Sequence, residues 1–532
     1  MFKMKMLRKY NNSKTFMFGE LSKFPEHNAQ SSKFPEHNVQ SSKFPDHHAR
    51  SQRHPLSILR KYTPLLIGIL YIFQTSCKLP IPAQMPTLKS VPNAYNNATD
   101  TTNSAQMNWR DFFNDKNLIA LIDTAIRNNP EVLMTLQDIE MAHNKVQMRH
   151  GALRPSVMAG GGLGVEKVGR YTSQGAGDAS AEITPGNIVP EILTDISGGI
   201  RASWEIDVWG KLRAAKSAAL TKYLGSFEGR NFVMTNLIAE VANSYYELLA
   251  FDNQLDIIRQ TIQLQTNQLE VVKVQKEAAV VTELAVKQFE AQILNSQSME
   301  YEILQSIIET ENKINFLLGR YPQPIVRDKE TLTAQLPNRI KQGIPSQLLK
   351  NRPDIRQAEL EIIAAKWDVK VAQLEFYPSL SVSGALGLQS FSPRYLYKLP
   401  ESLASSLIGD MAGPIINKNA IMAEFKTANA LQIQAMYEYQ KTILNAYFEV
   451  TNELARIDNL EKHYEYKAKE VEVQTKSIDI ANDLFKSARA NYLEVLNTQR
   501  EALDSKLELV ELKKRQFNAV TNVYRALGGG WK

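Results

Sequence analysis

The chain has 532 residues, is 43% hydrophobic and carries a formal net charge of +6. The positive charge is confined to its start: residues 1–57 hold ten basic and four acidic side chains, whereas from Cys77 onward there are 52 acids and 50 bases. The body of the protein therefore has no basic excess for a polyanion, which argues against a nucleic-acid partner. No GxSxG, HExxH or P-loop sequence occurs, so we expect no enzyme, no cofactor and no metal site.

Residues 1–57 form a leader that contains three near-identical decapeptides, at 21–30, 31–40 and 41–50. Each copy carries a proline and lacks a helical or strand period, which predicts disorder. The histidines of these repeats are interpreted as polar filler rather than metal ligands. Alternatively, the true start codon lies near Leu56, and residues 1–55 are upstream translation.

Residues 58–76 have the pattern of a secretory signal peptide. Arg60 and Lys61 precede a short apolar core at 65–73, which is too short to span a bilayer comfortably. Cys77, the only cysteine, follows directly and is predicted to be a lipidation site, although Gln74 stands where bacterial lipoboxes prefer leucine. The alternative is an unmodified cysteine beside an ordinary cleavage site.

Residues 77–108 are rich in Pro, Asn and Thr and are expected to be an extended tether behind the lipid anchor. The folded part begins at Trp109, where helical and strand-like hydrophobic periods start to alternate. The predicted helices are 117–150, 212–275, 282–318, 420–486 and 490–527, and the predicted strands are 155–164, 196–208, 379–388 and 405–416. The Gly- and Ser-containing stretches 165–195 and 389–402 between strands are expected to be exposed loops.

The folded part is written twice, with a first repeat at 109–340 and a second at 341–532. Short segments match in the same order in both. The pairs are Asn129-Pro130 with Arg352-Pro353, Pro155-Ser156 with Pro378-Ser379, Tyr245-Tyr246 with Tyr447-Phe448, and Leu318-Gly319 with Leu527-Gly528. Ordered matches of this kind indicate a duplicated supersecondary unit.

The last predicted helix carries a heptad repeat, and its apolar positions are Leu496, Leu503, Val510, Phe517 and Tyr524. A sustained heptad predicts a narrow apolar seam against another long helix in a left-handed coil. The fold class is therefore mainly α with membrane β, each repeat contributing two strands and two long coiled-coil helices. Four strands alone would leave unpaired edges in lipid, so other copies of the chain are expected to complete the sheet.

The stretch from Trp109 to Lys532 resembles the outer-membrane efflux factors, the TolC-type family, and within it the lipoprotein branch that serves resistance-nodulation-division pumps. The resemblance is carried by the duplicated segments above together with Trp204–Lys211, Asn351–Ile355 and Asn491–Arg500. It implies a homotrimer with a twelve-strand outer-membrane barrel on a periplasmic α-helical barrel. It also implies two partners, a periplasmic adaptor protein and an inner-membrane resistance-nodulation-division transporter. The expected function is the lipid-anchored outer-membrane conduit of a tripartite efflux pump.

The resemblance also assigns candidate sites at the two helical turns, near 277–282 and 486–491. The helices that begin after these turns close the periplasmic aperture in the family, so the aperture ring maps to Glu494 and Asn497, with Arg489 as a possible partner of Glu494. The family often has acids at both ring positions, and Asn497 should weaken that negative ring. A plainer interpretation is that Glu494 is a solvated acid favoured by the helix dipole.

The adaptor-contacting turns map to Ala278, Ala279 and Ala488, where the family commonly has glycine. Trp204 and Trp209 are interpreted as packing or membrane-belt residues at the base of the barrel. Alternatives that share the fold are an outer-membrane conduit for type I protein secretion or for metal export. A periplasmic structural coiled-coil lipoprotein, a different class, would not explain the glycine-rich alternating strands.

Overall fold

The computed structural model describes residues 79–95, 102–333, 341–414, 416, 418–487 and 489–531. The predicted leader at 1–57, the signal segment at 58–76, the lipidation site Cys77 and the turn residue Ala488 lie outside the described residues.

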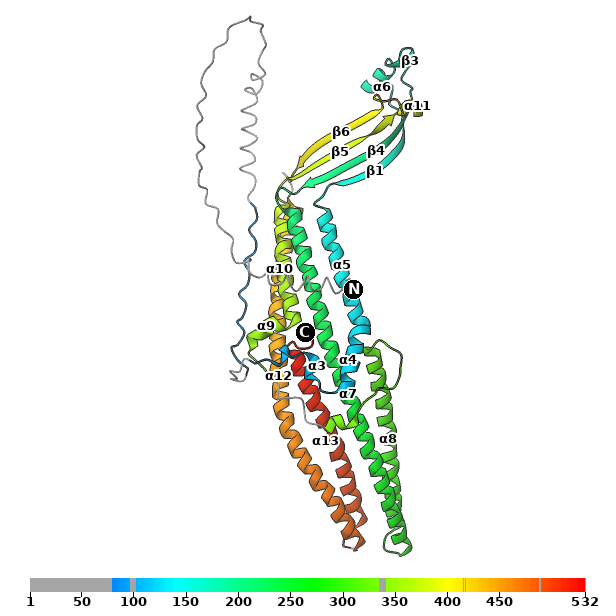
Figure 1. The fold of residues 1–532 in the computed structure, drawn as a ribbon, viewed down its shortest axis with the longest axis vertical. Helices are drawn as coiled ribbons and strands as arrows, with labels where there is room; N and C mark the ends of the chain where they lie inside the picture. The colour runs from blue at the N-terminus through cyan, green and yellow to red at the C-terminus, as the bar shows by residue number, and fades with distance from the viewer. Residues whose placement is uncertain are drawn as a thin grey trace. The chain divides into compact units, whose positions relative to one another are not determined.

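Two very long helices, α7 (Lys211–Glu277) and α12 (Asn419–Lys486), run through the helical part (Figure 1). They have 67 and 68 residues, which at ~1.5 Å per residue gives a length of about 100 Å each. A short turn joins each to a helix of 35 residues, α8 (Glu283–Leu317) after α7 and α13 (Tyr492–Ala526) after α12. All four were predicted from the sequence with nearly these bounds. None of the described helices is both long and apolar enough to cross a membrane.

The helix predicted at 117–150 is in fact two helices, α4 (Lys116–Asn128) and α5 (Pro130–Gly151). Proline lacks the N–H that would continue the helix and its ring collides with the preceding turn, so the chain must break at this point. Asn129 adopts a non-helical backbone, and its side chain accepts hydrogen bonds from the N–H groups of Glu131 and Val132. A cap followed by proline therefore starts a new helix. In the second repeat, α10 (Pro353–Leu374) also begins at a proline after an extended residue, Arg352, but without a side-chain cap.

Four long antiparallel strands form one sheet in the order β1-β4-β5-β6. Their bounds are β1 Ser156–Glu166, β4 Leu193–Ile206, β5 Ser379–Ser390 and β6 Leu403–Ala412. The central pair joins the two repeats, with Trp204 of β4 opposite Val382 of β5. Among the described residues, β1 pairs only with β4 and β6 only with β5, so both outer edges of the sheet are unpaired in the single chain.

The loops expected at 165–195 and 389–402 are not featureless. The first holds α6 (Ser173–Asp178) and a small hairpin of β2 (Glu182–Thr184) and β3 (Asn187–Ile188), and the second holds α11 (Pro393–Leu396). The remaining short elements are η1 (Ser104–Gln106), α3 (Trp109–Phe112), η2 (Lys329–Thr333), η3 (Pro345–Gln347) and α9 (Leu348–Asn351). Elements this short leave no hydrophobic period to detect in the sequence.

The four helices next to the sheet, α5, α7, α10 and α12, lie in the same order as the strands that they adjoin. In this region, which we call the upper half, α5 packs on α7, α7 on α10, and α10 on α12 (Figure 1). In the lower half, which ends at the two turns, α8 packs on α7, and α13 packs on both α7 and α12. Since α5 leads into β1 and α12 follows β6, the sheet and the upper helices end at the same two edges.

The largest core lies at the level where the upper and lower halves meet. It gathers side chains from α3, α4, α7, α8 and α13, among them Leu118, Ile122, Tyr245, Ile314 and Tyr524. The predicted seam of α13 is confirmed at Leu503, Phe517 and Tyr524, which are buried, but the prediction that it is narrow was wrong. Further positions along the helix are buried, including Ala502, Leu512, Ala519 and Val523, because α13 packs against two helices at once.

Candidate functional site

The turn between α7 and α8 closes with a backbone geometry that glycine usually provides. Ala279 has φ of 58°, in the left-handed region, while the N–H of Val280 donates to the carbonyl of Gln275 and that of Ala279 to Lys276, both at 2.9 Å. These two bonds are the Schellman arrangement that ends a helix. An ion pair between Lys276 and Glu283 crosses the turn. The first tip is thus a compact, hydrogen-bonded unit that exposes Ala278 and Ala279.

The turn between α12 and α13 ends its helix with an equivalent bond, from the N–H of Arg489 to the carbonyl of Leu484 at 2.8 Å. Asn491 then starts α13, since its side chain accepts from the N–H groups of Leu493 and Glu494 at 2.9 and 3.1 Å. The two tips therefore share the bond that ends the first helix, but only the second has a side-chain cap, since Thr282 before α8 forms no such bond.

The predicted aperture residues Arg489, Glu494 and Asn497 are all exposed near the second tip. On α13, Val495 is fully buried in an apolar cluster of the lower half, while its neighbour Glu494 is exposed. Glu494 accepts a long hydrogen bond from the Asn491 side chain at 3.4 Å, and no ion pair among the described residues joins it to Arg489. The structure brings the three residues to one end of the molecule but does not join them.

At the level between the halves, each repeat stacks two shorter helices end on end. In the first repeat, the Asn129 side chain before α5 donates to the carbonyl of Leu317 at the end of α8, at 2.9 Å. In the second, the Arg352 guanidinium before α10 donates to the carbonyl of Ala526 at the end of α13, at 2.8 Å. In each repeat, the segment before the proline thus contacts the end of the helix that precedes the Leu-Gly pair, so the two repeats form the same kind of junction.

Glycine is required at both of these junctions. Gly319 and Gly528 have φ of 65° and 89° and terminate α8 and α13. A Cβ on Gly528 would lie 2.6 Å from the carbonyl oxygen of Asn351, and one on Gly319 would collide with the carbonyl of Asn128. At the first tip Ala279 is open to solvent, so a Cβ is accommodated there despite the left-handed backbone. The contrast explains why glycine stands at both junctions while the first tip carries alanine.

Arg352 is the centre of an ion-pair cluster at the second junction. Its guanidinium binds both carboxylate oxygens of Asp354, at 3.0 and 2.7 Å, and Glu449 of α12 at 2.8 Å. Burial lowers the pKa of Arg352, but the hydrogen bonds and charges of Asp354 and Glu449 raise it above its usual value. Glu449 also pairs with Arg525 of α13 at 2.7 Å. The cluster thus joins α10, α12 and α13.

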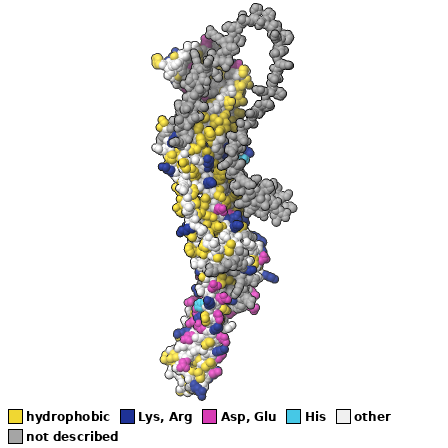
Figure 2. All heavy atoms as spheres, turned by 90° about the vertical axis from the view of Figure 1, so that its left-hand side faces the viewer, with side chains coloured by type: hydrophobic (Ala, Val, Ile, Leu, Met, Phe, Trp, Pro, Cys, Tyr) yellow, Lys and Arg dark blue, Asp and Glu magenta, His cyan; other side chains and the backbone are white. Residues whose placement is uncertain are grey.

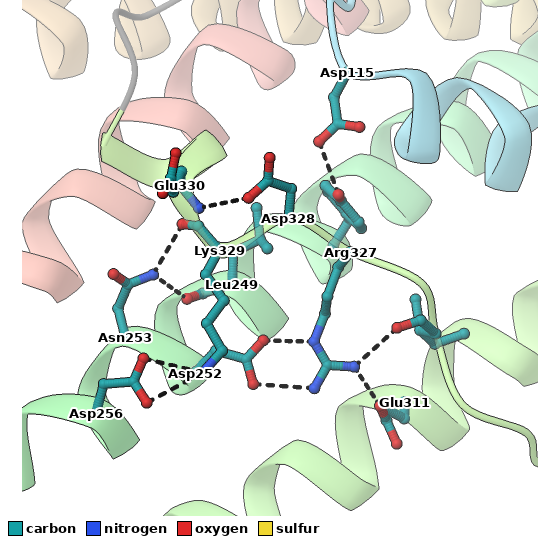
Figure 3. Close-up of polar contacts among 12 residues, drawn as sticks. Asp115, Leu249, Asp252, Asn253, Asp256, Glu311, Arg327, Asp328, Lys329 and Glu330 are labelled. Carbon is teal, nitrogen blue, oxygen red and sulfur yellow. Dashed lines mark hydrogen bonds and ion pairs between the residues drawn. The ribbon is translucent and has the colours of Figure 1, made fainter. Parts of the chain in front are cut away.

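A second cluster fastens the stretch that follows α8, and sequence reasoning missed it (Figure 3). Arg327 points between α7 and α8, where it binds Asp252 and Glu311 and donates to the carbonyl of Ile325 at 3.1 Å. Burial lowers the pKa of Arg327, but the two carboxylates raise it overall. Beside it, Lys329 pairs with Asp256 of α7 at 2.9 Å. These residues lie far apart in the sequence without a motif, so no local signal could have identified them.

The motif Trp204–Lys211 forms the joint between sheet and helices. The indole N–H of Trp209 donates to the carbonyl of Pro378 at 2.7 Å, and its ring stacks on Tyr377 with centroids 4.7 Å apart. Asp207 caps α7 by accepting from the N–H groups of Leu212 and Arg213, both at 3.0 Å. Burial raises the pKa of Asp207, but these bonds and the Arg213 side chain lower it below its usual value. The prediction that Trp209 is a packing residue agrees with these contacts.

The end of the tether lies against α10 and α12. Leu79 packs into an apolar cluster around Phe376 and Phe425, next to the sheet. Further along, the N–H of Ala83 donates to the Asn429 side chain at 2.7 Å, and the buried ring of Tyr95 stacks on Tyr447. The tether is therefore seated along the helices from the sheet end to the middle level. Among the described residues, no group of three His, Cys, Asp or Glu side chains is arranged to hold a metal ion.

Comparisons with known proteins agree with this architecture. A family model described as outer membrane efflux protein matches residues 121–320 and 344–529. The pyoverdine export outer membrane protein OpmQ of Pseudomonas aeruginosa is 27% identical over 426 residues, covering 80% of this chain and 87% of OpmQ. The cation efflux system protein CusC of Escherichia coli is 27% identical over 460 residues, covering 85% of this chain and 94% of CusC. The probable outer membrane lipoprotein SilC of Salmonella typhimurium is 26% identical over 455 residues, covering 85% and 93%.

A solved structure of CusC has the same fold, with a TM-score of 0.71 at 24% identity over 85% of this chain and all of that one. The family match extends over both repeats and most of the chain. The chain therefore belongs to the outer membrane efflux protein family.

Proposed function

We propose that the protein is the outer-membrane channel of a tripartite efflux pump. Three copies form a twelve-strand barrel on a helical tunnel, through which small molecules leave the cell. The protein is a passive conduit, and an inner-membrane resistance-nodulation-division transporter supplies both the energy and the choice of cargo. A periplasmic adaptor joins the two.

The observation that carries this function is the coincidence of open edges. The sheet ends at β1 and β6, and the upper helices end at α5 and α12, which are continuous with those strands. Unpaired strand edges are not tolerated in hydrocarbon, so the sheet must be closed by further strands. Apolar side chains such as Leu163 of β1 and Leu407 of β6, both more than 80% exposed, suit a lipid-facing surface. Closure by identical copies completes the sheet and the helical layer together.

The two tips are the proposed contact points for the adaptor, through Ala278, Ala279 and Ala488. Their hydrogen-bonded turns give a rigid surface of small side chains, flanked by exposed charges such as Lys276 and Glu283, on which helical hairpins of a partner can rest. Glu494 and Asn497 then line the aperture, with Arg489 beside them.

Lipidation of Cys77 would hold the channel at the correct height. Leu79, two residues later, is seated next to the sheet, so an acyl group on Cys77 would enter the membrane beside the barrel. A single acyl chain binds a bilayer only weakly, and here it would add to the anchoring by the barrel itself.

The relatives carry unlike cargoes in their names, pyoverdine for OpmQ and cations for CusC. A conduit that serves such different molecules does not select among them, and the transporter does. Metal export and protein secretion therefore remain alternative cargoes for the same channel.

The test is accumulation of a fluorescent efflux substrate in an in-frame deletion strain. Wild-type protein should restore low accumulation, and it should purify as a trimer in detergent. Glu494→Ala should preserve the trimer and change the entry of large antibiotics. A protein that is monomeric in detergent and restores neither dye nor metal resistance would refute the channel function.

A further inference from the structure

We infer that the copies of this chain join in the upper half through two matched heptad seams, one on α5 and one on α12, in a fixed register. This inference rests on the proposed trimeric channel and adds the residues and the register of the contact. The α5 seam comprises Met134, Gln137, Met141, Asn144 and Met148, and the α12 seam comprises Ala430, Gln434, Tyr437, Lys441 and Leu444.

Among the described residues of one chain, none covers the α5 seam. The positions of α5 that pack on α7, such as Val132 and Ile139, lie roughly half a turn away from it at 100° per residue. Met134, Met141 and Met148 recur every seven residues and are 61%, 56% and 61% exposed. Apolar positions at this spacing are the seam of a coiled coil and call for a facing helix.

The α12 seam has the same spacing and is equally uncovered. Its packed side, which includes Phe425 and Val450, faces α10 and the core. Tyr437 is 57% and Leu444 38% exposed, and both lie about a third of a turn from Phe425 at 100° per residue. Figure 2 views the molecule from the side on which α12 lies, and hydrophobic side chains gather over its upper part. Scattered apolar residues need no explanation, but apolar residues that recur at heptad spacing along one helix mark an interaction surface.

The two seams face each other at matching heights. The register of α10 against α12 is fixed by two contacts, Arg352 with Glu449 at one end and Phe376 with Phe425 at the other. The same number of residues separates these contacts on both helices, so each residue of α10 between them has a residue of α12 at the same height. The repeat relates α5 to α10 by a constant displacement, since Pro130 matches Pro353 and Pro155 matches Pro378.

We take equivalent positions of α5 and α10 to stand at the same height in the assembled channel. The residue of α12 that is level with a given α10 position is then also level with the equivalent α5 position of a neighbouring copy. Met134 then lies level with Leu444, Met141 with Tyr437, and Met148 with Ala430 of the second copy. The helices run antiparallel, as do β1 and β6, so one closure satisfies both layers.

The facing side chains are complementary. Methionine fills irregular gaps and its sulfur packs favourably against an aromatic ring, which suits Met141 against Tyr437. The intervening pairs are polar, Gln137 with Lys441 and Asn144 with Gln434, and polar residues within a seam fix its register.

The same edge continues in the lower half. On α8, Leu294, Tyr301 and Ile308 recur every seven residues and are exposed, and on α12 Tyr466 and Val473 do the same. We therefore assign a second copy as the occupant of the upper seam, because it offers exposed apolar residues at the same spacing along the whole edge.

Disulfide cross-linking of the full-length protein in membranes tests the register. The matched variant is Met141→Cys with Tyr437→Cys, and a second matched variant is Gln137→Cys with Lys441→Cys. The control is Met134→Cys with Tyr437→Cys, which is displaced by one heptad, about 10.5 Å along the axis, beyond the ~7 Å reach of a disulfide. The parent protein, whose single cysteine is Cys77, gives the background. Native size and dye efflux are measured in parallel.

We expect both matched variants to give covalent dimers and trimers on a non-reducing gel, at least several-fold more than the control. Linkage of the displaced control as well as the matched pairs would overturn the register. A trimeric, efflux-competent protein in which neither matched pair links would overturn the seam but leave the channel function standing. A monomeric protein without efflux would overturn both.

Discussion

Arg352 should be among the most destabilising positions to truncate, because one side chain serves three helices. It is 7% exposed and donates four hydrogen bonds, two to Asp354, one to Glu449 and one to the Ala526 carbonyl. In Arg352→Ala, the Ala526 carbonyl loses this donor in a buried site, at a cost of roughly 1–3 kcal/mol. Hydrogen bonds to charged groups add roughly 1.5–3 kcal/mol.

The sum must be discounted, because Glu449 keeps its bond to Arg525 and is itself partly exposed. We therefore expect Arg352→Ala to lower the free energy of unfolding by about 3 kcal/mol. Arg352→Lys should cost less, since an ammonium keeps the charge but cannot bind Asp354 and Ala526 together.

The assay is guanidinium chloride unfolding in detergent, followed by far-UV circular dichroism at one fixed protein concentration, because the stability of an oligomer depends on concentration. Lys469→Ala is the matched control, since its ion pair with Glu465 is exposed on both sides and such surface pairs contribute little to stability. If Arg352→Ala loses no more than this control, the junction is not held by Arg352 and the reasoning fails.

Three further predictions use the same measurement. Ala279→Gly should stabilise the protein by about 1 kcal/mol, because glycine adopts the left-handed backbone without strain. Ala278→Gly is the control and should not stabilise it, because φ at Ala278 is −78°. Equal effects of the two substitutions would contradict backbone strain at Ala279. Gly528→Ala should lower the free energy of unfolding by at least ~1–2 kcal/mol, because its Cβ would collide with the backbone of Asn351. Gly151→Ala is the control and should be neutral or stabilising, because its Cβ would have no atom within 4 Å. If Gly528→Ala is as stable as the parent protein, the expected collision is relieved by a shift of the junction. Because the folded pKa of Asp207 is lowered, its stabilisation is present above its unfolded pKa of about 3.9 and lost as the pH falls through the folded value. Asp207→Asn should therefore flatten the stability profile below about pH 4 and leave α7 less stable at neutral pH, and an unchanged profile would remove Asp207 as its cause.

The sequence predicted the long helices and the four strands well because their signals are periodic and repeated. Heptads and alternating strands persist over many residues, and the duplication gives each element a second example. Breaks between helices were harder to predict. Pro130 was placed in an early turn of one helix at 117–150, but it is the first residue of a second helix, α5.

Contacts between distant residues could not be predicted from the sequence. The cluster of Arg327, Asp252 and Glu311 has no motif, and each residue alone looks like an ordinary surface charge. The tether was expected to be a simple extended linker, yet Tyr95 is fully buried against Tyr447, since a single aromatic residue in a polar stretch gives no period. The apolar seam of α13 was predicted to be too narrow. A heptad repeat indicates one facing helix, whereas α13 packs against both α7 and α12.

The end-on junctions have a mechanical consequence for the helical part. The helical part consists of four columns of helix. Two columns are single continuous helices, α7 and α12. Each of the other two is a pair of helices that meet end to end at mid-height, α8 with α5 and α13 with α10. A sideways load on the tips is therefore carried by elastic bending of the two rods, while the jointed columns yield by parting at Asn129 and Leu317 or at Arg352 and Ala526. The strength of those two contacts sets how stiffly the lower half follows the upper.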